Sequence, residues 1–141
     1  MQIGVDSQRA VENRRVFVVD NDEVVGMALQ FMLADEMETH VLQGSAEALS
    51  KGAAAPPDVL LLGSGVLASE GVDVVTRLKA GLPGVKILLV CLDAAEDDVR
   101  AALALGADST LLRPLKVENV RRRVDTQLGR RTPLEIPVVL R

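Results

Sequence analysis

The chain has 141 residues, of which 48% are hydrophobic and 26% charged, and its formal net charge is −4. This balance is typical of one globular domain and excludes an intrinsically disordered chain. Aromatic residues make up only 1%, with no Trp or Tyr, so the bases of a single-stranded nucleic acid would have almost no rings to stack on.

Short apolar runs alternate with helical patterns through most of the chain. In chain order, strands are predicted at residues 15–19, 39–42, 59–62, 85–91 and 110–112, and helices between and after them at 23–34, 45–51, 71–80, 95–105 and 117–128. Such alternation indicates parallel strands joined by helical crossovers. We therefore predict an α/β domain over residues 14–128, with a doubly wound five-stranded parallel sheet flanked by five helices.

The two ends of the chain differ from this pattern. Residues 1–13 are polar and predict an N-terminal tail. Residues 129–141 contain Pro133 and Pro137, which exclude a continuous helix, together with apolar stretches at 134–136 and 138–140. We interpret residues 129–141 as a C-terminal extension, either a linker to a further domain or an arm that packs on its own domain or on a second copy.

The predicted topology brings distant residues to one edge of the sheet. In parallel α/β sheets, ligands and reacting groups lie outside the carboxyl ends of the strands. Asp20, Asn21, Gly63, Cys91 and Arg113 all end or follow predicted strands. We therefore expect these five residues to share one pocket.

Neighbouring residues complete this part of the prediction. Asp22 or Asn21 is placed to cap the helix at 23–34. Gly63-Ser64-Gly65 is predicted to be a loop, and the alternation of side chains along the preceding strand directs Ser64 away from the pocket. Asp58 begins the same strand at the opposite edge of the sheet.

Several short motifs occur in the order and spacing of one family. They are Val18-Val19-Asp20-Asn21-Asp22, Pro57-Asp58, Gly71, Ala104-Leu105-Gly106-Ala107-Asp108 and Arg113-Pro114. On these motifs, the chain resembles the receiver domain of bacterial two-component response regulators. Members of that family have a doubly wound fold, and they receive a phosphoryl group from a histidine kinase on an aspartate with the help of Mg²⁺. The resemblance implies the same fold for this chain.

The resemblance gives a role to each position of the pocket. Asp20 matches the first of two acidic residues that support the metal, and Asn21 replaces the second, which in the family binds the metal directly. Gly63 stands at the position of the phospho-acceptor aspartate, and glycine has no side chain to phosphorylate. The resemblance therefore implies that Asp20 and Asn21 are the remains of a metal site.

Three more positions differ from the family and one agrees with it. Cys91 replaces a Ser or Thr hydroxyl that contacts the phosphoryl group, Thr110 replaces an aromatic switch residue, and Arg113 replaces a lysine. Pro114 is unchanged, and the resemblance implies a cis peptide bond between Arg113 and Pro114. Together these differences predict a degenerate receiver, or pseudo-receiver, that needs no phosphorylation, metal or cofactor and is not an enzyme.

Two hypotheses about side chains remain open at this point. The Arg113 guanidinium either closes onto the Asp20 carboxylate as an ion pair or turns to solvent. Cys91, the single cysteine, is interpreted as a small buried hydrophobe rather than a redox sensor, and it excludes an internal disulfide.

The leading functional prediction is a signalling module that binds a protein partner. Arg121, Arg122 and Arg123 on the last predicted helix are the candidate docking surface, and a homodimer is a further expectation. No nucleic-acid partner is expected, because the chain has so few aromatic residues. No membrane contact and a cytoplasmic location are expected, because no apolar run is long enough to span a bilayer. The alternatives are a sensor of a small anion or metabolite in the vacated pocket and, last, an unusual phosphate-accepting response regulator.

Overall fold

A computed structural model describes residues 14–129, and the predictions made for residues 1–13 and 130–141 lie outside the described residues. The sheet has five parallel strands in the order β2-β1-β3-β4-β5. The strands are β1 Arg15–Val19, β2 Glu38–Leu42, β3 Val59–Gly63, β4 Lys86–Cys91 and β5 Ser109–Leu112. The predicted doubly wound, five-stranded parallel sheet is confirmed.

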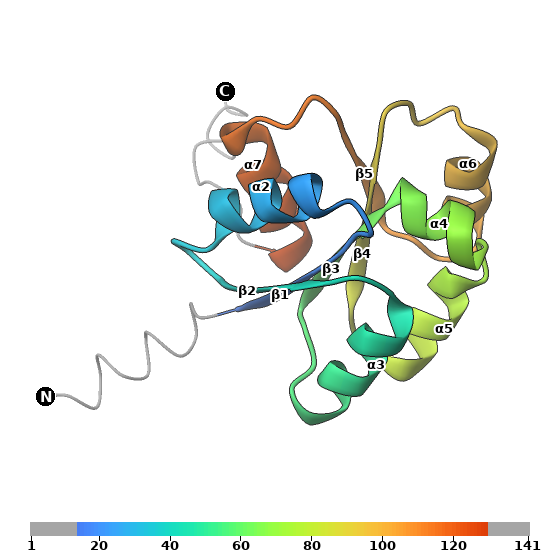
Figure 1. Ribbon diagram of the computed structural model, residues 1–141, viewed down its shortest axis with the longest axis horizontal. Coiled ribbons are helices and arrows are strands. Elements are labelled where there is room, and N and C mark those ends of the chain that lie inside the picture. Colours follow the sequence, from blue (N-terminus) through green and yellow to red (C-terminus); the bar gives the residue numbers. More distant parts are fainter. Residues whose placement is uncertain (1–13, 130–141) are drawn as a thin grey trace, which may run out of the picture.

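Helices cover both faces of the sheet (Figure 1). They are α2 Glu23–Leu33, α3 Ser45–Ala54, α4 Ser64–Glu70, α5 Val74–Gly81, α6 Asp97–Ala104 and α7 Val117–Leu128. α2 and α7 lie side by side on one face, and the other four helices cover the opposite face. Within residues 14–129, no helix combines the length and the apolar content that a bilayer crossing requires.

The prediction of five helices was wrong by one, because the segment after β3 is helical. The Gly63-Ser64-Gly65 segment was expected to be a loop, but α4 begins at Ser64. Val66 and Leu67 of this helix are each 1% exposed and belong to the core beneath it. Their burial outweighs the low helix propensity of Gly65. Gly71, with a φ of 90°, then ends α4 before α5 begins.

The core has two layers, one on each face of the sheet. Alternate residues of each strand enter opposite layers: in β1, Val16 and Val18 pack towards α2 and α7, whereas Phe17 and Val19 pack towards the other helices. All four side chains are fully buried. Because helices cover the strands on both faces, each strand is a nearly continuous run of apolar residues in the sequence, and the run ends at the solvent-exposed edge of the sheet.

Local hydrogen bonds fix the start of α2 and the end of β5, which border the pocket. The Asp22 carboxylate caps α2 by accepting the backbone N–H groups of Val24 at 3.0 Å and Val25 at 3.3 Å. The backbone N–H of Arg113 donates to the Cys91 carbonyl at 2.9 Å, which extends the pairing of β5 with β4 by one residue. The Arg113–Pro114 peptide bond is cis, as predicted.

Candidate functional site

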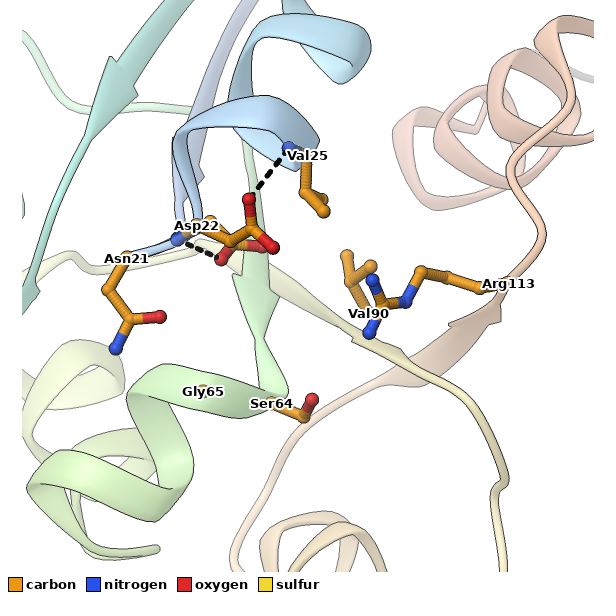
Figure 2. A pocket seen from close by; sticks show the side chains of 8 residues that line it. Asn21, Asp22, Val25, Ser64, Gly65, Val90 and Arg113 are labelled. Carbon is orange, nitrogen blue, oxygen red and sulfur yellow. Dashed lines mark hydrogen bonds between the residues drawn. The ribbon is translucent and has the colours of Figure 1, made fainter.

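A small pocket lies at the edge of the sheet where the strands end, and Val90 of β4 is the strand residue in its lining. Its volume is about 190 Å³, and its walls come from the β1–α2 loop, the start of α4 and the residue after β5 (Figure 2). The pocket is lined by Asp20, Asn21, Asp22, Val25, Ser64, Gly65, Val90 and Arg113. The predicted convergence of Asp20, Asn21 and Arg113 is therefore found in the structure.

Gly63 lies directly against Asp20. β1 and β3 are neighbours in the sheet, so the residues that end them meet. A Cβ atom added to Gly63 would lie 2.8 Å from Oδ1 of Asp20 and closer still to Oδ2, which is nearer than real Cβ contacts come. The backbone itself does not demand glycine here, since φ is −73° and ψ is 145°. The Asp20 carboxylate therefore fills the space into which a side chain at position 63 would project.

The Asp20 carboxyl is buried, with only 7% of the residue exposed. Its Oδ1 accepts the backbone N–H of Asp22 at 2.9 Å. Burial raises the pKa of Asp20 above its ordinary value, and the negative charge of Asp22 raises this pKa further. The hydrogen bond from the Asp22 backbone and the positive charge of Arg113 act in the opposite direction and lower the pKa. Desolvation is the largest of these effects, so the folded protein holds a proton on Asp20 more tightly than the unfolded chain does.

The raised pKa of Asp20 predicts a pH-dependent effect of Asp20→Asn. Because the folded state binds the proton more tightly, the carboxyl lowers stability as pH rises from the ordinary pKa of 3.8 through the raised value. Asparagine has no such charge, and its amide oxygen can still accept the Asp22 N–H. We expect the stability of Asp20→Asn relative to wild type to increase between pH 3 and pH 7 in urea unfolding.

The control for this measurement is Asp73→Asn, which changes an exposed carboxyl at the start of α5, outside the pocket. Both variants are unfolded in urea at the same pH values, so that the effect of removing a carboxyl from the pocket is compared with that of removing one outside it. A pH-independent difference between Asp20→Asn and wild type would contradict the assignment of Asp20 as a carboxyl destabilised by burial.

Arg113 faces the pocket without closing it. Figure 2 shows its side chain entering beside Val90 from the segment after β5. Within residues 14–129, no ion pair joins Arg113 to Asp20, so the hypothesis of a direct Asp20–Arg113 ion pair is not supported. The residue is half-buried, and its Nε is a buried donor with no hydrogen-bond partner. The guanidinium therefore acts on Asp20 through its charge and retains unused hydrogen-bonding capacity.

Ser64 lines the pocket, contrary to the prediction that it points away. That prediction applied the two-residue alternation of a strand beyond the end of β3. The chain enters α4 at Ser64, and the helical turn directs its side chain into the cavity, as Figure 2 shows. Sequence reasoning also missed four other lining residues. Asp22 was considered only as a helix cap and Gly65 only as part of a loop, whereas Val25 and Val90 carry no polar group that signals a site.

Four residues assigned to the pocket do not line it, and the first is Gly63, which lies next to Asp20 but is not part of the cavity wall. Cys91 is fully buried in the layer on the opposite face of the sheet, with Sγ 3.7 Å from the Leu89 carbonyl, and Val90 takes its place beside the cavity. Thr110 and Pro114 also lie outside the lining. Burial raises the pKa of the Cys91 thiol, as expected for an unreactive small hydrophobe.

The donor set at this edge of the sheet does not fit a divalent cation. Mg²⁺ is usually held by one or two carboxylates with near-octahedral oxygen ligands. Among residues 14–129, no three acidic, cysteine or histidine side chains are grouped to hold a metal. Asp22 already caps α2, Asn21 offers an uncharged amide, and Gly63 offers no side chain.

The three consecutive arginines of α7 do not form one surface. Arg121 donates from Nε to the Met32 carbonyl at 2.9 Å and pairs with Glu36 at 3.4 Å and with Asp35 at 3.6 Å, so it joins α7 to α2. Arg122 and Arg123 are exposed and line a separate polar cavity of about 280 Å³ with Ser109 of β5. Successive residues of a helix are about 100° apart, which explains this division.

Comparisons with known proteins agree with this geometry. Residues 16–125 match the family described as the response regulator receiver domain. The chain is 33% identical over 122 residues to the transcriptional regulatory protein PrrA of Mycobacterium leprae, covering 86% of this chain and 52% of that protein. It is 27% identical over 109 residues to the response regulator protein VraR of Staphylococcus aureus, covering 75% and 52%. The chain thus spans about half the length of these curated relatives.

Solved structures show the same fold at low identity. A putative response regulator from Chloroflexus aurantiacus has a TM-score of 0.74 at 21% identity, covering 84% of this chain and 99% of that one. The receiver domain of a sensor histidine kinase from Pseudomonas aeruginosa, solved with a magnesium ion coordinated in its active site cleft, has a TM-score of 0.73 at 18% identity, covering 83% and 98%.

Proposed function

We propose that this chain, which belongs to the response regulator receiver domain family of two-component signalling, works without phosphorylation as a protein-binding module. The observation that carries this proposal is the contact between Gly63 and Asp20. Phosphoryl transfer needs an oxygen nucleophile with room for the incoming group. Position 63 offers no oxygen, and the Asp20 carboxylate occupies the adjacent space.

Other features of the pocket support the same conclusion. The donor set does not fit a divalent cation, and the residue at the position of the family's hydroxyl, Cys91, is buried away from the cavity. Asp20 remains but is engaged by the Asp22 N–H and destabilised by burial. Position 63 therefore lacks the carboxylate nucleophile, and the family's hydroxyl position lacks an oxygen that faces the cavity.

The face formed by α7 and β5 is the proposed docking surface. Arg122 and Arg123 line the polar cavity there, and the Arg123 guanidinium donates to the Ser109 hydroxyl at 3.3 Å. Exposed guanidinium groups beside hydroxyl and amide side chains suit an acidic protein partner. Arg121 is excluded from this surface because α2 engages it.

The test is exposure of the full chain to acetyl phosphate and Mg²⁺, followed by intact-mass measurement. We expect no phosphoryl adduct. Ser64→Ala is the control variant, because Ser64 is the hydroxyl side chain that lines the pocket. An adduct on the wild-type chain would contradict the proposal, and its loss in Ser64→Ala would identify the serine as the acceptor.

A second candidate function is the binding of a small anion in the same pocket. It is favoured by the Arg113 Nε, a buried donor without a partner, and by Ser64 across the cavity. It is disfavoured by Asp20 and Asp22, whose carboxylates share that cavity. In the acetyl phosphate experiment, a thermal shift without an adduct, abolished in Arg113→Gln, would favour this second function.

A further inference from the structure

The outer face of α2 carries an uncovered apolar stripe. Val24, Met27 and Phe31 are 76%, 65% and 82% exposed. Their spacing of three and four residues places them on one side of the helix. Phe31 is one of only two phenylalanines in the chain, and the other, Phe17, is fully buried. Large apolar side chains gathered on a surface indicate a site that another segment covers.

The stripe borders a groove of about 500 Å³ between α2 and α7, which lie side by side in Figure 1. Met27 and Phe31 from α2 and Val117 from α7 provide its apolar lining. Asp35 and Arg121 stand at its rim and pair with each other at 3.6 Å. The groove is therefore apolar along its length and charged at one end.

We propose that residues 134–140 of the same chain occupy this groove. Gly129 ends α7 with a φ of 78°, the left-handed conformation that turns a chain away from the helix axis. Along the axis of α7, Val117 in the groove lies about 18 Å from Gly129, at a rise of 1.5 Å per residue. An extended chain covers a similar distance, about 17 Å at roughly 3.4 Å per residue, between Gly129 and Leu134. Residues 134–140 can therefore reach the groove from where α7 ends.

The composition of residues 134–140 suits an apolar groove. Leu134, Ile136, Val138 and Leu140 alternate along the sequence. In a β-like extended conformation, which tolerates proline at the edge of a sheet, alternate side chains point to the same side. The segment would thus present a continuous apolar edge to α2 and α7. The prolines also reduce the conformational entropy lost when the segment is ordered.

Charge favours the same placement. Arg130 and Arg131 follow Gly129 in the sequence, and the turn after α2 carries Asp35 and Glu36. Of these acidic groups, Asp35 keeps a side chain that is 82% exposed although it pairs with Arg121. Two further arginines near this end of the groove would add to the neutralisation of its acidic rim.

Tethering favours this segment over a second copy of the chain. A segment joined by a short flexible link has an effective concentration in the millimolar range at its own site. A second copy competes only at the protein concentration in solution. The proposal is therefore an intramolecular contact that does not depend on the proposed function of the phosphorylation pocket.

A single tryptophan tests the proposal in the full chain. The chain has no Trp, so Phe31→Trp introduces one fluorescent reporter into the groove. We expect its emission to be that of a partly buried indole, independent of protein concentration. Adding Ile136→Ser and Val138→Ser should move the emission to longer wavelength and increase its quenching by acrylamide, because the indole becomes hydrated.

Leu92→Trp is the matched control, since Leu92 is 66% exposed and lies outside the groove. Its emission should not respond to the two serine substitutions, and circular dichroism of each variant checks that the domain is folded. Three results would overturn the proposal: an indole at position 31 that is already fully hydrated, a buried indole unaffected by the serines, or an emission that changes with protein concentration. The last result would assign the groove to a second copy.

Discussion

Gly63→Ala is expected to lower the free energy of unfolding by about 1–3 kcal/mol, the usual cost of forcing an extra methyl group into a packed site. The added Cβ overlaps the Asp20 carboxylate. Asp20 is buried and its Oδ1 is held by the Asp22 N–H, so it cannot move without losing that hydrogen bond. Because the φ of −73° is ordinary for alanine, the effect comes from the lack of space and not from the backbone.

Gly65→Ala is the matched control for Gly63→Ala. A Cβ at Gly65 would overlap the Asn21 side chain just as closely. Asn21 is exposed, however, and makes no hydrogen bond within the described residues, so it can turn into solvent. Since alanine is favoured over glycine inside a helix by about 1 kcal/mol, Gly65→Ala should leave stability unchanged or increase it. Urea unfolding of both variants measures the contrast.

A double-mutant cycle assigns the effect to Asp20. Asp20→Ala removes the carboxylate that a side chain at position 63 would meet. We expect the combination of Gly63→Ala with Asp20→Ala to cost less than the sum of the two single changes, with a coupling energy of about 0.5–3 kcal/mol. Additive effects would show that some other neighbour excludes a side chain from position 63.

The sequence predicted the fold well because its apolar pattern is strong. β1 and α7 occur at the predicted residues, and the other strands differ by one residue at one end. The exception was α4, where Gly63-Ser64-Gly65 signals a turn to local reasoning. Burial of Val66 and Leu67 decides the conformation there, and burial depends on neighbours that a short window of sequence does not contain.

The candidate site was predicted less completely than the fold. Asp20, Asn21 and Arg113 converge because they follow strand ends, which topology alone places at one edge. The direction of a side chain beyond a strand end depends on the next element, so Ser64 was misplaced. The overlap at Gly63 could not be predicted, because it depends on the rotamer of Asp20 and on the hydrogen bond that fixes it.

Gly63→Asp, which supplies the missing carboxylate, is expected to be the most destabilising substitution at this edge of the sheet. It adds both the overlap of Gly63→Ala and a second negative charge beside Asp20. Two unit charges 4 Å apart interact by about 4 kcal/mol at an effective dielectric constant of 20. Gly63→Asn is nearly the same in shape but uncharged, so it should lose less stability at pH 7 in the same unfolding experiment.

The difference between the two variants should shrink as pH falls. Like charges raise the pKa of a carboxyl pair, so the folded Gly63→Asp protein keeps a proton that the unfolded chain releases. Its extra loss of stability therefore develops as pH rises above the ordinary carboxyl range and is absent below it. Equal stability of the two variants at pH 7 would contradict this account.

Added Mg²⁺ separates electrostatic repulsion from simple crowding in Gly63→Asp. A divalent cation shared by two adjacent carboxylates removes their repulsion, whereas the overlap of atoms remains. We expect millimolar Mg²⁺ to recover part of the stability of Gly63→Asp and none of that of Gly63→Asn, in thermal unfolding at constant ionic strength. Recovery in the aspartate variant alone would mean that the natural chain lacks only a carboxylate for cation binding. No recovery in either variant would mean that Asn21 and the surrounding loop also prevent cation binding.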